Sequence, residues 1–121
     1  MQVESGNVQS LDVFYIPTYI IYDARVTPER MLNEYRYKVS VRELSNSGES
    51  AALLSALKRT TVRAFSGPAD LRWSVSFRLV DGSTHEVYMD GFGRYGQIDG
   101  LTASFEGGLY HWLRQLTACL K

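Results

Sequence analysis

The chain contains little of what most metal-binding and catalytic sites require. It has one cysteine, Cys119, and two histidines among 121 residues. A single cysteine excludes an intramolecular disulfide and a zinc site built on several cysteine ligands. Neither His85 nor His111 has a second histidine or a cysteine at the spacing of metal ligands. We therefore expect no metal site and no bound cofactor.

An excess of charge of one sign is also missing, as are long hydrophobic runs. Thirteen basic residues balance thirteen acidic ones, so the formal net charge is zero. Dedicated nucleic-acid-binding proteins normally carry excess positive charge, and we predict no nucleic-acid partner. No apolar run approaches the roughly 20 residues of a transmembrane helix. The single cysteine fits a cytoplasmic location, whereas a periplasmic one applies if an export segment has been removed.

Signatures of catalytic nucleophiles and phosphate-binding loops are missing or lie in the wrong context. No Gly-x-Ser-x-Gly nucleophile elbow occurs. Residues 91–96 (GFGRYG) have the spacing GxGxxG, but they follow a predicted strand and open no helix, as a dinucleotide-binding loop would. We interpret these glycines as turn formers. The chain is therefore predicted to be a protein without enzymatic activity.

The clearest positive signal is a regular alternation of apolar and polar residues. Apolar residues occupy the odd positions from Leu71 to Leu79, polar residues occupy the even ones, and a second alternation runs from His85 to Met89. Successive side chains of a strand leave opposite faces of the sheet. This pattern predicts a β-hairpin with one buried face.

The turn of this hairpin follows from the pairing that it imposes. A two-residue loop would place Phe77 opposite Glu86 on the core face, whereas a three-residue loop over 80–82 pairs apolar residues with each other. We therefore predict the three-residue loop, with Gly82 in the left-handed conformation. Three cross-strand pairs follow from this register: Val75 with Val87, Trp73 with Met89, and Arg72 with Asp90.

The remaining elements are predicted from periodicity and turn residues. Residues 11–22 favour a strand that Pro17 either breaks in two or restricts to a sheet edge. Residues 37–41 alternate like a second strand, and Thr27 is a suitable N-cap for a short helix over 28–33. Further predictions are a turn at 45–48, a helix over 49–60 with the stripe Leu53, Leu54 and Leu57, a two-residue turn in Ile98–Leu101, and a C-terminal helix along Leu109, Trp112, Leu113, Leu116 and Leu120.

Together these elements predict an α+β fold. Residues 1–10 are expected to form a disordered lead-in, and residues 11–121 a single domain. That domain is predicted to contain a mainly antiparallel sheet of 4–6 strands with helices packed on one face. The C-terminal helix is predicted to cover Trp73, Val75 and Phe77.

One face of the predicted sheet carries several cations with small serines between them. Exposed tyrosine beside arginine is typical of protein interfaces. The alternative is a solvated face whose charges are met by nearby acids, each pair contributing little. The residues predicted to contact a partner are Arg36, Lys38, Arg42, Arg72, Arg78, Tyr88 and Tyr95.

We therefore expect a small non-enzymatic module that binds another protein through this basic sheet face or through the glycine-rich loops. An inhibitor or immunity-type protein of a bacterial toxin fits the size of the chain. Two alternatives stay open: a periplasmic or lipid-anchored accessory domain, and a domain that binds a small ligand. The ligand pocket of the second alternative would be lined by Trp73, Phe77, His85 and Trp112.

Overall fold

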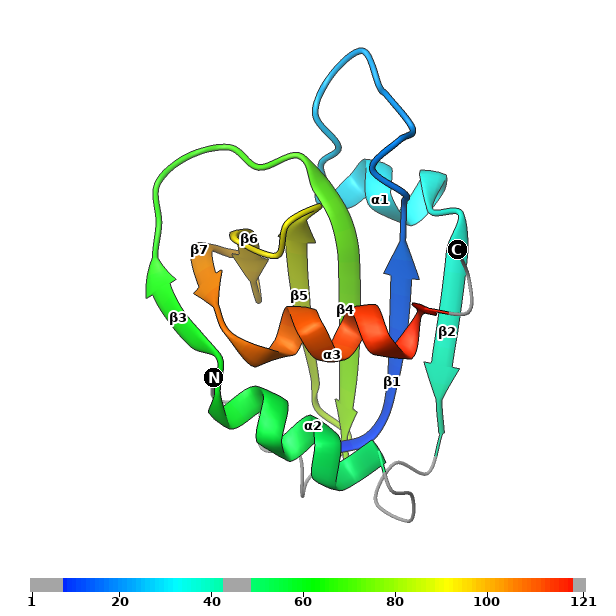
Figure 1. Ribbon diagram of the computed structural model, residues 1–121, viewed down its shortest axis with the longest axis vertical. Helices are drawn as coiled ribbons and strands as arrows, with labels where there is room; N and C mark the ends of the chain where they lie inside the picture. The colour runs from blue at the N-terminus through cyan, green and yellow to red at the C-terminus, as the bar shows by residue number, and fades with distance from the viewer. Residues whose placement is uncertain (1–7, 43–48, 119–121) are drawn as a thin grey trace.

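The computed structural model describes residues 8–42 and 49–118. Within them the chain forms seven strands and three helices (Figure 1). In chain order these are β1 (Val8–Tyr15), α1 (Pro28–Glu34), β2 (Tyr37–Val41), α2 (Glu49–Lys58), β3 (Thr61–Ala64), β4 (Leu71–Leu79), β5 (Thr84–Asp90), β6 (Tyr95–Ile98), β7 (Leu101–Glu106) and α3 (Gly108–Leu116).

All seven strands belong to one sheet in the order β2-β1-β4-β5-β6-β7-β3, and every pairing is antiparallel. The α+β class and the antiparallel sheet are confirmed, but the predicted 4–6 strands are too few. The strand that the sequence did not indicate is β3. It is short and mostly exposed, so it has no apolar alternation that would reveal it.

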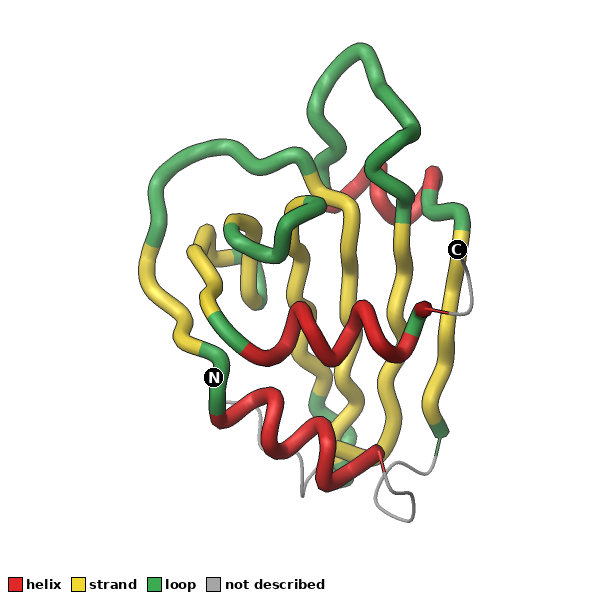
Figure 2. Tube along the Cα trace, in the orientation of Figure 1, coloured by secondary structure: helices red, strands yellow, loops and turns green. Residues whose placement is uncertain are grey.

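Helices α2 and α3 cover one face of the sheet, with α3 lying across the central strands (Figure 1; Figure 2). The buried side chains of α3, including Trp112 and Leu113, join Trp73, Val75 and Phe77 in one hydrophobic core cluster. The predicted cover of the central hairpin by the C-terminal helix is therefore confirmed. Leu53 and Leu57 of α2 belong to the same cluster, whereas the side chain of Leu54, residue Leu120 and the predicted turn at 45–48 lie outside the description.

The β4–β5 hairpin has the predicted odd loop and register. Gly82 has a φ of +89°, and its N–H donates to the carbonyl of Leu79 at 3.0 Å. Val75 pairs with Val87 and Trp73 with Met89, as predicted. The predicted pair of Arg72 and Asp90 is wrong, because the register shifts between Leu71 and Trp73 and Leu71 pairs with Asp90. Such a bulge re-aims side chains, and Leu71 joins a second cluster instead of the main core.

The second cluster is formed by α1 and the segment between β1 and α1. Ile16, Val26 and Met31 pack there against Leu71 and Tyr88, and Tyr88 points away from the main core between Val87 and Met89. The prediction that all helices pack on one face is therefore wrong for α1. The helix itself begins where predicted, with the N–H of Arg30 donating to Thr27 Oγ1 at 3.3 Å.

The first strand begins and ends earlier than predicted. Val8 is fully buried in β1, so residues 8–10 belong to the fold and not to a lead-in. The strand ends at Tyr15, before Pro17, and it lies between β2 and β4. It is therefore neither split in two nor placed at an edge. Within the described ranges, no helix has the length and hydropathy needed to cross a membrane.

The β6–β7 hairpin has the predicted two-residue turn. Ile98 pairs with Leu101, and both turn residues have positive φ, +48° at Asp99 and +84° at Gly100. Aspartate and glycine are the residues that such a turn accepts most readily. The turn lies beside β5, because the Asp99 N–H donates to the carbonyl of Glu86 at 2.9 Å.

Candidate functional site

Part of the outer sheet face, opposite α2 and α3, is basic. Four exposed cations lie on or beside β2 and on β4, and we call these residues the basic face: Arg36, Lys38, Arg42 and Arg78. Small side chains occupy the positions between them, because Ser10 pairs with Arg78, and Asp12 pairs with both Ser40 and Ser76. The surface between the cations is therefore built from short side chains.

None of the four cations forms an ion pair with another residue of the described ranges. Asp12 lies on β1, between the two strands that carry these cations, and it accepts a hydrogen bond of 2.5 Å from the Ser40 hydroxyl. The charged groups of the basic face are thus exposed to water and have no described acid that neutralises them.

An aromatic pair borders the basic face at one end. The rings of Phe14 and Tyr35 meet edge to face with centroids 4.8 Å apart, and Tyr35 is 39% exposed. The Lys38 ammonium lies 5.4 Å from the centroid of Phe14. Tyr35 is followed by Arg36 in the chain, so an exposed aromatic ring and two cations adjoin there.

Two residues predicted for this face, Arg72 and Tyr88, are buried instead. Arg72 is 6% exposed, and its guanidinium contacts the Asp70 carboxylate at 3.0 Å, the Ile20 carbonyl at 3.1 Å and the Tyr22 ring at 5.1 Å from the centroid. Burial and the neighbouring Glu86 raise the pKa of Tyr88. The segment between β1 and α1 folds over this end of the face, which removes both side chains from contact with a partner.

The predicted ligand pocket is not formed by its four residues. Trp73 and Phe77 lie in the packed core. Trp112 lines a hollow between α2 and α3 with Arg59 and His111. His85 lies on β5, where its Nδ1 is 2.6 Å from Oδ2 of Asp99. Trp73, Phe77 and Trp112 thus belong to one packed core, whereas His85 contacts Asp99 on β5, so the four side chains do not line one hollow in the described part of the chain.

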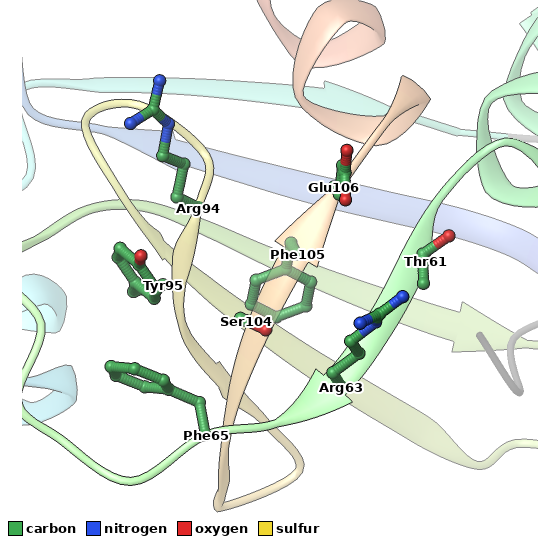
Figure 3. A pocket seen from close by; sticks show the side chains of 8 residues that line it. All are labelled: Thr61, Arg63, Phe65, Arg94, Tyr95, Ser104, Phe105 and Glu106. Atoms are coloured by element: carbon green, nitrogen blue, oxygen red, sulfur yellow. The ribbon is translucent and has the colours of Figure 1, made fainter.

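Tyr95, the last predicted contact residue, lies on β6, separated from β4 by β5. It lines a hollow of about 690 Å³ over β7 together with residues from β3 (Figure 3). The sequence does not indicate this hollow, because Arg63 and Phe65 fall in a segment without alternation. Only the pairing of β3 with β7 brings them to Tyr95.

The Asp99 carboxyl has a shifted pKa whose causes lie in its contacts. Burial by itself raises its pKa, but hydrogen bonds from His85 and from the Glu86 N–H outweigh this effect, and the pKa of Asp99 is lowered. Within the described ranges, no group of three or more His, Cys, Asp or Glu side chains converges as metal ligands.

The ionised form of Asp99 is therefore expected to stabilise the fold. A lowered pKa contributes stability that is present above the unfolded value, about 3.9, and is lost as the pH falls through the folded value. Asp99→Asn is expected to be less stable than the wild type at pH 6, by less than about 1 kcal/mol because the side chain is 44% exposed. This difference should shrink at pH 3, as measured by urea unfolding. Asp23→Asn is the control, and a difference for Asp99→Asn that is independent of pH contradicts the prediction.

Comparisons of the chain with protein-family models, with curated proteins and with solved structures found no match.

Proposed function

We propose that the chain is a non-enzymatic protein-binding module, of the inhibitor or immunity type, and that its basic face docks on an acidic surface of another protein. The observation that carries this proposal is the group of four exposed cations without a described ion-pair partner, gathered on one part of a protein with no net charge. Among the described residues no acid pairs with this group, and we infer that a partner supplies the complementary charge.

The shape of the basic face supports a protein as the partner. Serines and one aspartate lie between the cations on neighbouring strands, so a second surface can approach the sheet closely. Charges of opposite sign across an interface accelerate association and select the partner. Such a contact is expected to weaken as salt is added, because exposed charges are screened over about 8–10 Å at physiological ionic strength.

The aromatic end supplies the apolar part of such an interface. Interfaces derive most of their affinity from a few residues, with tyrosine and arginine enriched among them. Tyr35 is partly exposed beside Arg36, and its ring is held by Phe14. Tyr35 and Arg36 are therefore the residues expected to contribute most to binding, while Lys38, Arg42 and Arg78 orient the partner.

The test is reversal of charge at two exposed positions that no described contact requires. The double variant Arg36→Glu, Arg78→Glu is expected to fold normally, because exposed substitutions usually change stability by less than about 0.5 kcal/mol. Its affinity for a protein captured by the wild-type chain from the source cells should fall roughly 100-fold, which corresponds to about 2.7 kcal/mol. Biolayer interferometry with that protein, at low and at physiological salt, measures both effects.

The matched control is Arg63→Glu, Arg94→Glu, which changes the net charge equally but lies on and beside β3 and β6. The proposal requires that this control keeps the partner that the first variant loses. It is contradicted if both double variants bind equally well, or if the wild type captures no protein at micromolar concentration. An inhibitor role further requires that the captured protein loses its activity on binding.

A further inference from the structure

The hollow over β7 lies on the part of the sheet farthest from the basic face. Its shape follows from the side chains that pair across β6, β7 and β3. Tyr95 of β6 pairs with Ser104 of β7, which in turn pairs with Arg63 of β3. A small side chain thus lies between two large ones, with the flanking strands roughly 10 Å apart. Ser104 forms the floor, Tyr95 and Arg63 form the walls, and the cavity volume is about 690 Å³ (Figure 3).

One wall is aromatic and firmly positioned. The ring centroids of Phe65 and Tyr95 lie 4.5 Å apart, with 32° between the ring planes. The backbone of Phe65 is held to β7, because its carbonyl accepts from the Thr102 hydroxyl at 2.5 Å and its N–H donates to the Thr102 carbonyl at 3.4 Å. The pair therefore presents an ordered aromatic surface to the hollow.

The opposite wall is cationic. Figure 3 shows Arg63 across Ser104 from the two rings, with Arg94 and Glu106 toward the other end of the hollow. Neither arginine forms an ion pair with another residue in the described part of the chain. A guanidinium presents a planar array of donors that matches both oxygens of a carboxylate.

We propose that this hollow binds a small planar carboxylate, with its ring against Tyr95 and Phe65 and its carboxylate on the Arg63 guanidinium. Ligand sites of about 300–1,000 Å³ typically combine apolar walls with a few placed polar groups, and this hollow has both. The hydroxyls of Ser104 and Thr61 are available as further donors to the carboxylate. Arg94 offsets the negative charge of Glu106 at the same end of the hollow, so that Arg63 leaves the lining with a net positive charge that favours an anion.

The test is a titration of the full chain with naphthalene-2-carboxylate, followed by two-dimensional amide NMR. We expect saturable shifts centred on Arg63, Tyr95 and Ser104. Two analogues separate the contributions, because 2-naphthalenemethanol lacks the charge and cyclohexanecarboxylate lacks the aromatic ring. Both are expected to bind at least about tenfold more weakly than naphthalene-2-carboxylate.

Two variants locate the site. Ser104→Leu fills the floor and is expected to abolish the shifts. Arg63→Gln, at an exposed position, keeps the fold and is expected to weaken binding about tenfold, whereas the control Arg78→Gln on the basic face leaves it unchanged. The proposal is overturned if the shifts do not saturate or centre elsewhere, if either analogue binds as well as naphthalene-2-carboxylate, or if Arg63→Gln binds like the wild type.

Discussion

Replacing Gly96 with alanine is expected to destabilise the domain by about 3 kcal/mol or more. A Cβ at this position would lie 1.8 Å from the carbonyl oxygen of Tyr88 and 3.0 Å from the Cα of Met89. Both atoms belong to the backbone of β5, to which β6 is paired, so neither can move without opening this pairing. Since β6 connects β7 and β3 to the rest of the sheet, the damage extends to three strands.

Urea unfolding of Gly96→Ala, followed by tryptophan fluorescence, measures this effect. The matched control is Gly100→Asn in the neighbouring turn. A Cβ at Gly100 meets no atom within 4 Å, and asparagine tolerates its φ of +84°. The control is expected to lose less than about 1 kcal/mol. A Gly96→Ala protein as stable as this control would contradict the close approach of the two strands.

Replacing Trp73 with alanine is expected to cost about 3–5 kcal/mol, which is a large part of the stability of a domain of this size. Trp73 is 2% exposed in the centre of the main core. The centroid of its ring lies 4.2 Å from that of Tyr15 and 6.1 Å from that of Tyr110. Its Nε1 has no hydrogen-bond partner among the described residues. The loss therefore arises from packing and cavity formation.

Differential scanning calorimetry of Trp73→Ala and Trp73→Phe tests this assignment. The phenylalanine variant keeps part of the aromatic contact and is expected to lose less than the alanine variant. Phe92→Ala is the surface control, because this ring is 71% exposed, and it should change stability by less than about 0.5 kcal/mol. An alanine variant at position 73 that is as stable as the surface control would show that the core does not depend on this residue.

The prediction from sequence succeeded where apolar and polar residues alternate regularly along an element. In β4 and β5 a shift by one residue would move serines and Glu86 into the main core, so the alternation determines the register of Val75 and Val87. The same argument holds for α3, whose apolar stripe includes Trp112 and Leu113. In both cases the signal comes from residues that are close together in the chain.

The prediction failed where a segment folds onto a face from a distance. Arg72 has the pattern of an exposed strand residue, yet Tyr22 and the Ile20 carbonyl cover it. Tyr88 is buried by the same segment. The exposure of β3 hides it from any search for alternation, and with it the hollow that Arg63 and Tyr95 share. Of the residues predicted to contact a partner, the fold keeps Arg36, Lys38, Arg42 and Arg78 exposed on the outer face, and it places Tyr95 in the hollow over β7 instead.

By itself the sequence determined the α+β class, the central hairpin with its odd loop, and the helix that covers it. These features follow from short-range periodicity and turn chemistry, which act within about 20 residues of chain. Only the tertiary structure decided which side chains of the outer face meet water, and that β3 lies beside β7. Those outcomes depend on contacts between residues far apart in the chain, such as Arg72 with Ile20 and Arg63 with Ser104, which local patterns do not encode.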